Sequence, residues 1–447
     1  MRAAPGPLRG PVSRRSGTSE PDRRGVLRHP GIRGPARAAR VVAALSLTAC
    51  YPSPGDPGGV PPPPAPFLRA PYVQNVDTTA ASILWMRAAG SSGDTAWFRP
   101  AGGDSSSWRA VDPYVRAQGV RSARLRGLPA GVDVEYVVEA AGDRFGPWRF
   151  ETAPAPGAGD SVRVLLFGDS GWGTEPQIDL AREMERHDWD LAIHVGDIAY
   201  DDGSKDQFTE RHFRVYRELL ARVPLFPAIG NHDVRADDGR SYDLAFDWPA
   251  PDPGVRWYSF RWGPALFVAL DSSSPTEAVR GLRRGEGPQY EWLARTLRTA
   301  HGDTTVAWTI VYLHHPPYSH AVGISGHGQQ FDIRRALVPL FEDFGVDLVA
   351  AGHDHHYERS RPLRADRAVE PGCGTVYVVQ GAGGASRYAR DVATSPLQAA
   401  RSRDHSFTRL VVYRDRIEGR TLRADGSDVD AFTIRPWTGP GASGCGP

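Results

Sequence analysis

Seven side chains that can supply oxygen or nitrogen ligands stand just beyond short apolar runs. They follow five such runs, in the order Asp169, Asp197 with Tyr200, Asn231, His314, and His353 with His355. In open α/β sheets the loops beyond the carboxyl ends of strands form the ligand crevice, so donors at five such ends can converge. Carboxylate, amide, imidazole and phenol donors without a thiolate suit Mn, Fe, Zn or similar ions, and they argue against a structural cysteine–zinc site. The sequence therefore predicts a metal site where these strands end.

Seven donors can serve two metal ions if one carboxylate binds both ions. Asp197 is the best candidate for this bridge, because Tyr200 follows three residues later and can bind one of the same two ions. Two ions about 3.5–4 Å apart polarise a phosphoryl oxygen and stabilise the attacking and leaving oxygens of an in-line displacement. The donor set therefore predicts hydrolysis of a phosphate ester, with a metal-held hydroxide as the attacking group.

The motifs that carry these donors read GDSG, GDIAY, GNHD, VYLH and GHDHHYER. In this order they resemble the five motifs of the purple acid phosphatases, which are members of the binuclear metallophosphoesterase superfamily. The resemblance covers roughly residues 66–437. It implies an acid phosphatase that hydrolyses phosphomonoesters.

The resemblance also implies which metal each donor binds. Fe(III) is expected to bind Asp169, Asp197, Tyr200 and His355. A divalent Fe, Zn or Mn ion is expected to bind Asp197, Asn231, His314 and His353. Tyr200 is the discriminating residue, because tyrosinate on Fe(III) marks this family. Fe(III) lowers the pKa of its water more than a divalent ion does, which favours activity at acidic pH.

Three further histidines are candidates for contacts with the substrate. His232 is expected to contact the substrate phosphate. Members of the family carry one or two histidines about ten residues after the ligand that His314 matches, to assist the leaving group. His327 fits that position if three residues are inserted, and His320 is the alternative.

Several polar residues neighbour the predicted ligands without belonging to the donor set. Asp233 is a candidate to fix the tautomer of the His232 ring, although it could equally cap a turn. His315 and His356 stand beside predicted ligands and could support them from behind. His194 lies inside its apolar run and is expected to be structural.

Length and composition predict a globular chain of more than one domain. The chain has 447 residues, of which 40% are hydrophobic. Short strand-like segments, with Tyr136 as a candidate tyrosine corner, predict a fibronectin III-like β-sandwich before an α/β domain of two mixed sheets flanked by helices. The expected organisation is a leader at 1–50, a Pro- and Gly-rich linker at 51–66, the all-β domain at 67–155, the catalytic domain at 160–437 and a flexible tail at 438–447.

The leader indicates export from a bacterial cell. Arginines precede the short apolar run 41–49, and Cys50 follows it as in a lipobox, so Cys50 is expected to carry a lipid unless an ordinary signal peptide is cleaved. The product is therefore a periplasmic or cell-surface lipoprotein, or a secreted protein. The lipid is the only membrane contact expected, because no later segment reaches the roughly 20 apolar residues of a span. Cys373 and Cys445 then remain as a disulfide or as two thiols.

The motifs predict a phosphate ester as the substrate, and the charge balance argues against nucleic acid as a partner. The net charge is +1, but ten arginines and two acids lie in residues 1–40, so the rest of the chain is acidic and has no nucleic-acid footprint. No feature indicates an oligomeric state. Two alternatives to the phosphomonoesterase are a phosphodiesterase or nucleotidase on the same metals, and a surface binding module with a structural metal site.

Overall fold

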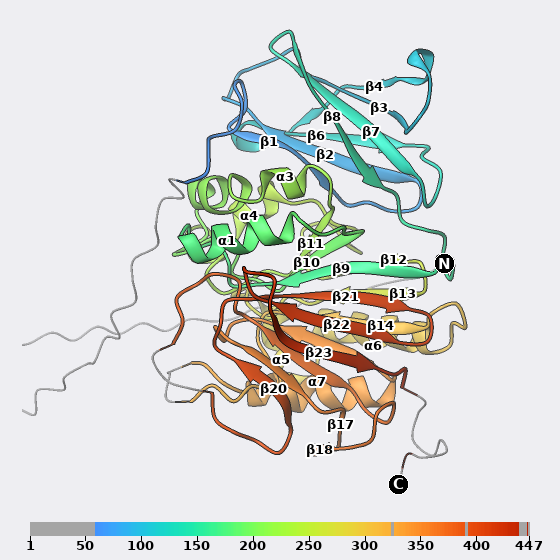
Figure 1. Ribbon diagram of the computed structural model, residues 1–447, viewed down its shortest axis with the longest axis vertical. Coiled ribbons are helices and arrows are strands. Elements are labelled where there is room, and N and C mark those ends of the chain that lie inside the picture. Colours follow the sequence, from blue (N-terminus) through green and yellow to red (C-terminus); the bar gives the residue numbers. More distant parts are fainter. Residues whose placement is uncertain (1–58, 323–325, 389–391, 438–444, 446–447) are drawn as a thin grey trace, which may run out of the picture. The chain divides into compact units, whose positions relative to one another are not determined.

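Two antiparallel four-stranded sheets form the N-terminal part of the chain in a computed structural model of the protein (Figure 1). The structure describes residues 59–322, 326–388, 392–437 and 445. One sheet has the strand order β1 (Arg69–Gln74), β2 (Ala80–Met86), β6 (Val120–Arg126) and β5 (Tyr114–Val115). The other has the order β4 (Arg109–Val111), β3 (Thr95–Pro100), β7 (Asp133–Ala140) and β8 (Asp143–Glu151).

These two sheets pack face to face around a shared apolar core. Trp85 of the first sheet and Phe98 and Tyr136 of the second are at most 1% exposed and belong to one buried cluster. Along β6 the buried Ala123 and Leu125 alternate with arginines, as the two-residue period of a strand requires. This alternation is the signal by which the sequence predicted strands here.

Two larger mixed sheets follow. The six-stranded sheet has the order β11 (Leu225–Pro227), β10 (Leu191–His194), β9 (Ser161–Phe167), β21 (Phe407–Tyr413), β22 (Ile417–Leu422) and β23 (Asp428–Ile434). The seven-stranded sheet has the order β12 (Tyr258–Trp262), β13 (Ala265–Ala269), β14 (Trp308–Tyr312), β15 (Leu348–Ala351), β19 (Val376–Gln380), β16 (Tyr357–Ser360) and β20 (Gln398–Ser402). A small pair is formed by β17 (Leu363–Arg364) and β18 (Arg367–Ala368). Strands β9 to β11 are parallel, as are β13, β14, β15 and β19, so the carboxyl ends in each group meet at one edge.

Helices cover the outer faces of these two sheets. Over the six-stranded sheet lie α1 (Glu175–Met184), α2 (Lys205–Gln207), the π-helical turn Phe208–Phe213, α3 (Arg217–Leu220) and α4 (Arg240–Ala245). Over the seven-stranded sheet lie α5 (Glu277–Arg284), α6 (Gly287–His301) and α7 (Phe331–Asp343). Short 3₁₀ turns at Ser105–Ser107 and Ala117–Gly119 lie in the N-terminal sandwich.

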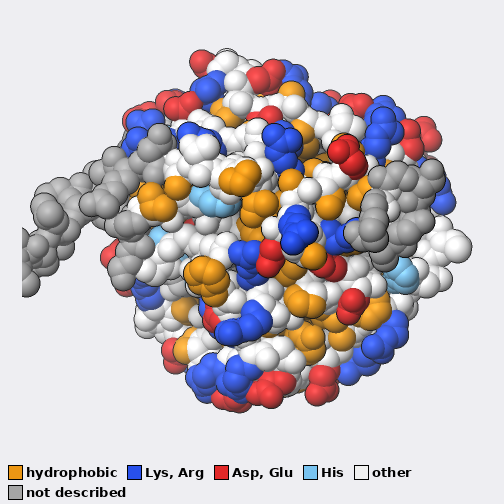
Figure 2. Space-filling view, turned by 90° about the horizontal axis from the view of Figure 1, so that it is seen from below, with side chains coloured by type: hydrophobic (Ala, Val, Ile, Leu, Met, Phe, Trp, Pro, Cys, Tyr) orange, Lys and Arg blue, Asp and Glu red, His pale blue; other side chains and the backbone are white. Residues whose placement is uncertain are grey.

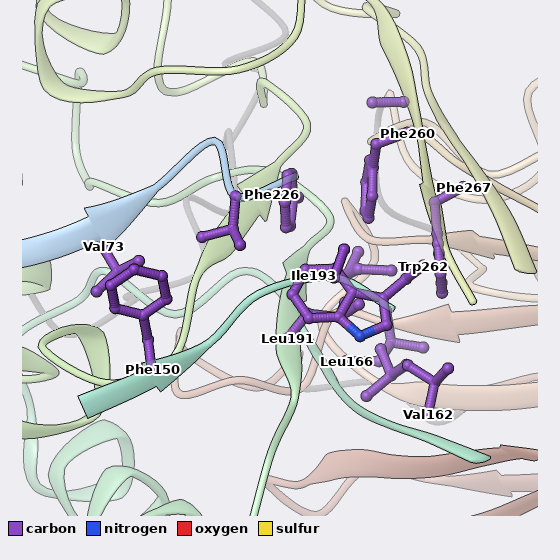
Figure 3. Packing of buried hydrophobic residues seen from close by; sticks show 14 of the residues in the cluster. Val73, Phe150, Val162, Leu166, Leu191, Ile193, Phe226, Phe260, Trp262 and Phe267 are labelled. Carbon is purple, nitrogen blue, oxygen red and sulfur yellow. The ribbon is translucent and has the colours of Figure 1, made fainter. Parts of the chain in front are cut away.

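The inner faces of the two mixed sheets pack against each other. In β9, Leu166 points to this shared core, while Leu165 and Phe167 belong to the cluster under the helices. Figure 3 shows Leu166 and Ile193 near Trp262 and Phe267 of the second sheet. Because both faces of these strands are largely buried, their sequences are nearly continuous apolar runs. The structure confirms the predicted fold class of two mixed sheets flanked by helices and preceded by all-β sheets.

Tyr136 does not form the predicted tyrosine corner. In such a corner the phenol bonds to backbone a few residues upstream. Here the Tyr136 hydroxyl donates to the carbonyl of Ala221, after α3, at 2.7 Å. The Tyr72 hydroxyl likewise donates to the carbonyl of Ala245 at 2.7 Å. Both phenols therefore tie the N-terminal sandwich to the helical layer of the six-stranded sheet.

The segments that flank the folded core are partly described. The carbonyl of Val60 accepts a hydrogen bond from Arg214 at 2.8 Å, and those of Pro61 and Pro62 accept from Arg217 at 2.8 and 2.9 Å. This part of the expected linker therefore lies on the helical layer. The leader, with the lipid expected on Cys50, lies outside the described residues.

A disulfide joins the C-terminal end to the catalytic part of the chain. Cys445 is bonded to Cys373, which decides between the two alternatives for this pair. Residues 438–444, where the sequence predicts flexibility, lie outside the described part. Among the described residues, no helix is long and apolar enough to span a membrane.

Candidate metal centre

The seven predicted donors come from loops at adjoining edges of the two mixed sheets. The six-stranded sheet supplies Asp169 after β9, Asp197 and Tyr200 after β10, and Asn231 after β11. The seven-stranded sheet supplies His314 after β14, and His353 and His355 after β15. The carboxyl ends of these parallel strands bring all seven side chains together, as the sequence predicted.

The backbone at the donors is held in uncommon conformations. Asp169, Asp197 and His353 have φ values of 53°, 55° and 71°, a region that residues with side chains seldom adopt. Such strain persists where surrounding contacts enforce it, and it gathers at functional sites. Glycines make the close approach possible: a Cβ added at Gly352 would overlap the Asp169 carboxylate, and one at Gly230 would overlap Asp197.

One group of donors surrounds the phenol of Tyr200. Its hydroxyl oxygen lies 3.1 Å from Asp169 Oδ1, 3.1 Å from Asp197 Oδ2 and 3.1 Å from His355 Nε2. The second group surrounds Asn231. Its Oδ1 atom lies 2.9 Å from His314 Nε2 and 2.9 Å from His353 Nδ1.

Asp197 belongs to both groups through different oxygens. Its Oδ2 faces Tyr200, while its Oδ1 is 3.4 Å from His314 Nε2 and accepts the backbone N–H of His232 at 2.8 Å. A carboxylate with one oxygen in each group has the arrangement of a bridge between two ions. The structure therefore places the expected bridging residue between the two donor groups.

The three histidines each present a lone pair to the centre. His314 donates its Nδ1–H to the carbonyl of Val195 at 2.9 Å, and His355 donates its Nδ1–H to that of Ser386 at 2.7 Å. His353 donates its Nε2–H to the carbonyl of Gly326 at 3.0 Å. A carbonyl can only accept, so in the neutral ring the nitrogen facing the donor group is the unprotonated one. Such outer contacts fix the tautomer of metal-binding histidines. The donor set therefore fits two metal ions.

Electrostatics favour positive charge between the two groups. Asp169 and Asp197 are 0% and 1% exposed. Burial raises the pKa of Asp169 well above its usual value, and the charge of Asp197 raises it further. Burial opposes protonation of His314, but the Asp197 carboxylate raises the pKa of that ring to about 9, so a proton competes with a metal ion for the Nε2 that faces this carboxylate. Cations bound here would offset the cost of burying two carboxylates.

His232 lies at the open edge of the first group. Its Nδ1–H donates to the carbonyl of Asp201 at 2.6 Å, so Nε2 is left 3.8 Å from Asp197 Oδ2. Of the two roles left open for Asp233, it does not fix this ring, and its contacts match the alternative of capping backbone N–H groups. The Asp233 carboxylate instead accepts three backbone N–H groups, from Gly230 at 2.8 Å, Ile198 at 2.9 Å and Ala199 at 3.1 Å. It thereby joins two donor-bearing loops.

The structure brings His327 to the centre and places His320 elsewhere. The His327 ring stacks on that of His353, with centroids 4.4 Å apart and an interplanar angle of 14°. The Nδ1 atom of His327 lies 2.9 Å from Asp354 Oδ1. His320 is bound through both its backbone N–H and its ring to the Glu358 carboxylate. His320 therefore anchors the loop and makes no described contact with the donors.

Two contact residues were not predicted from the sequence. Asp354 holds His327, and its position between two predicted ligand histidines in GHDHHYER was an available signal. Tyr388 lies in a loop that no motif marks. Its hydroxyl is 2.8 Å from His327 Nδ1 and donates to the His353 carbonyl at 3.0 Å, while its ring stacks on His355 at 4.9 Å.

Comparison with known proteins agrees with this fold and donor set. Residues 162–357 match the family model of the calcineurin-like phosphoesterases. The chain is 27% identical to human acid phosphatase type 7 over 349 residues. The aligned region covers 72% of this chain and 78% of the human protein. It is 29% identical over 315 residues to an uncharacterized protein of Mycobacterium tuberculosis, covering 60% of this chain and 58% of that protein. The chain thus spans less than two thirds of the mycobacterial relative.

Solved structures extend the likeness to the whole fold. The purple acid phosphatase PPD1 of yellow lupin (Lupinus luteus) superposes with a TM-score of 0.70 at 20% identity, over 82% of this chain and 74% of that one. A structure of PhoD superposes with a TM-score of 0.64 at 13% identity, over 85% of this chain and 92% of that one. Residues 162–357 are a calcineurin-like phosphoesterase domain. The chain that contains them is a homologue of the purple acid phosphatases, and this fold implies a binuclear metal centre.

Proposed function

We propose that this protein is a phosphomonoesterase that uses two metal ions, with an acidic pH optimum. One observation carries the proposal: the Asp197 carboxylate lies between two donor groups, with Oδ2 3.1 Å from the Tyr200 hydroxyl and Oδ1 3.4 Å from His314 Nε2. Two ions so placed act on attacking and leaving oxygens together. The similarity to human acid phosphatase type 7 supports a monoester substrate.

The two donor groups differ in ways that suit different ions. The group with the phenol and two carboxylates would hold Fe(III): Asp169, Asp197, Tyr200 and His355. The group with the amide and two imidazoles would hold a divalent Fe, Zn or Mn ion: Asp197, Asn231, His314 and His353. When bound, the two ions supply Lewis acidity that activates water and polarises the phosphoryl oxygens. Anionic oxygen donors gather on the proposed Fe(III) side, as a trivalent ion prefers.

The chain's own groups bind and orient the ester. His232 presents Nε2 near Asp197, and its side chain is 16% exposed, so this nitrogen is placed to hydrogen-bond a phosphate oxygen. His327 holds a proton on Nδ1 toward Asp354, which leaves Nε2 to serve the leaving oxygen. We assign the leaving-group role to His327 and a loop-anchoring role to His320, because only the former contacts a donor ring.

A phosphodiesterase or nucleotidase is the second candidate. A barley (Hordeum vulgare) relative named nucleotide pyrophosphatase/phosphodiesterase is 26% identical over 331 residues, which cover 64% of this chain and 87% of that protein. The same metal ligands would serve a diester, so the choice depends on the loops around the centre. On the face seen in Figure 2, basic and acidic side chains are interspersed with hydrophobic ones.

The deciding experiment compares p-nitrophenyl phosphate with bis-p-nitrophenyl phosphate, hydrolysed by the metal-loaded full chain across pH. Faster turnover of the monoester at acidic pH is expected. Preference for the diester would move the function to a phosphodiesterase. The variant His232→Ala is the control: it should lose turnover and keep both metals. Turnover of neither ester by the wild-type protein would favour a binding module.

We also propose that the chain is exported, as a lipoprotein through Cys50 or as a secreted protein. The disulfide between Cys373 and Cys445 supports export, because disulfides persist in oxidising compartments. Fractionation of cells that express the full gene, followed by mass spectrometry of the N-terminal peptide, tests this. A cytosolic protein with free thiols would contradict it.

A further inference from the structure

His315 lies beside the second donor group without belonging to it. Its ring centroid is 4.5 Å from that of His353 and 5.1 Å from that of His314. The residue is 9% exposed, so a small part of it still reaches the surface. A polar ring in this position contacts the centre directly and can meet a ligand bound there.

The tautomer of His315 is fixed by Ser272. The Ser272 hydroxyl oxygen accepts the backbone N–H of His315 at 3.1 Å and lies 3.0 Å from the ring Nδ1. Ser272 is 1% exposed, and buried hydroxyl protons are normally donated. Within the described chain Nδ1 is the acceptor that this proton reaches, so Ser272 donates to Nδ1. The ring proton of His315 is therefore on Nε2.

The loop that carries Ser272 is itself rigidly held. The Asp271 carboxylate accepts the backbone N–H groups of Ser273 and Ser274, both at 2.9 Å. Gln289 bonds the Asp271 backbone on both sides, at 2.9 and 3.0 Å. Arg283 donates to the Ser272 carbonyl at 2.9 Å. This polar loop after β13 is therefore built to hold one hydroxyl in place.

We propose that His315 binds the substrate, with its Nε2–H donating a hydrogen bond to an oxygen of the phosphate group at the metal centre. Among the described residues nothing accepts from this Nε2–H. This nitrogen is also not one of the fully buried polar atoms, so a phosphate oxygen can reach it and accept its proton. The inference rests on the proposed function, because it requires phosphate at this site. In this proposal His315 contacts the phosphate and Ser272 orients the His315 ring, which adds a phosphate contact to that of His232.

The test measures binding of inorganic phosphate to the metal-loaded full chain by calorimetry, together with the KM for p-nitrophenyl phosphate. His315→Leu should raise the Kd for phosphate and the KM by about 10-fold to 150-fold, the range for one hydrogen bond to a charged group. His315→Gln, which keeps an N–H donor, should recover part of the loss. Ser272→Ala should weaken phosphate binding in the same direction.

Ser273→Ala is the matched control. Its hydroxyl is 3.5 Å from the same Nδ1, too far for a strong bond, so phosphate affinity should stay unchanged. Wild-type phosphate affinity in His315→Leu would overturn the proposal. Loss of metal in that variant would also overturn it, in favour of a ring that only packs against His353. If His315→Leu does not fold, Ser272→Ala decides alone.

Phosphate binding is measured without turnover, so the two proposals can fail separately. A wild-type protein that binds phosphate through His315 but hydrolyses no ester would contradict the phosphatase and keep this inference. If the wild-type protein hydrolyses esters and His315→Leu has the wild-type phosphate Kd and KM, the phosphatase proposal stands and this inference is contradicted.

Discussion

Asp354 should control departure of the leaving group, through the ring that it holds. Its side chain is 0% exposed, and each hydrogen-bond partner of its carboxylate is a donor. Oδ1 lies 2.9 Å from His327 Nδ1 and 3.1 Å from the Gly328 backbone nitrogen, while Oδ2 accepts the hydroxyl of Ser319. The carboxylate therefore fixes both the position of the loop and the proton on His327 Nδ1.

The variant Asp354→Asn keeps the volume and removes the charge. The amide has one oxygen and one NH₂ group, and every neighbour is a donor, so at least one of the bonds must break. A hydrogen bond to a charged group contributes about 1.5–3 kcal/mol. If this is lost from the transition state, kcat should fall by about 10-fold to 150-fold.

The assay compares two monoesters that differ in how much help their leaving group needs. p-Nitrophenolate departs readily, whereas an alkoxide must be protonated as the bond breaks. The loss of kcat in Asp354→Asn should therefore be larger for an alkyl phosphate than for p-nitrophenyl phosphate. Glu358→Gln is the matched control, because Glu358 anchors the same loop through His320 and not through His327.

Equal losses on the two esters would refute the reasoning, since they would show that Asp354 does not act through the leaving group. A leaving-group dependence of the same size in Glu358→Gln would also refute it, because the effect would then come from the loop as a whole. Metal content measured for each variant separates these outcomes from loss of the centre, since His353 and His355 flank Asp354 in sequence.

Three further outcomes are expected. Burial raises the pKa of Asp347 from 3.8 to about 7, so the folded protein keeps a proton that the unfolded chain releases. The free energy of unfolding should fall by up to about 4 kcal/mol as the pH rises from about 4 to 7, and urea titrations should show a flatter profile for Asp347→Asn. The Cys373–Cys445 disulfide closes a separation of 72 residues, so its reduction should lower the free energy of unfolding by about 4 kcal/mol in urea. Tyr200→Phe should abolish a visible tyrosinate-to-iron absorption band while metal analysis still finds two ions, and an iron-loaded wild type without colour would contradict the Fe(III) assignment.

The two mixed sheets could be predicted because burial on both faces leaves a direct trace in sequence. Runs such as 162–167 and 308–312 are apolar except for one polar residue each, Arg163 and Thr309, and each is followed by a motif. The apolar residues of region 206–221 have the spacing of a single helix, but the structure divides the region into α2, a π-helical turn and α3. Its spacing is helical throughout, and the breaks depend on tertiary contacts such as that of Arg69 with Thr209 at 2.9 Å, which no local pattern encodes.

The candidate site divides in the same way. The convergence of the seven donor residues could be predicted because each follows a strand, and strand order fixes where the strand ends meet. Contacts made by loops could not: Tyr388 reaches His327 from 61 residues away, and Ser272 reaches His315 from 43. Asp233 shows that adjacency in sequence does not guarantee a contact, since its carboxylate bonds the backbone of another loop and not the adjacent His232 ring. Proximity in sequence predicts a contact only where the backbone direction is also known.

The donors are divided between the two mixed sheets, so the packing of these sheets brings the two halves of the centre together. Both carboxylates, the phenol and the amide come from the six-stranded sheet, and all three imidazoles come from the seven-stranded sheet. Hydrogen bonds cross between them: His314 Nδ1–H donates to the Val195 carbonyl beyond β10, and the His353 backbone N–H donates to the Asp169 carboxylate at 3.0 Å. The contact that fixes the His314 tautomer therefore also joins the two sheets at this edge, and the backbone bond of His353 to Asp169 is a second link between them. Metal affinity and the packing of the sheets are then coupled, because loosening either contact would disturb both.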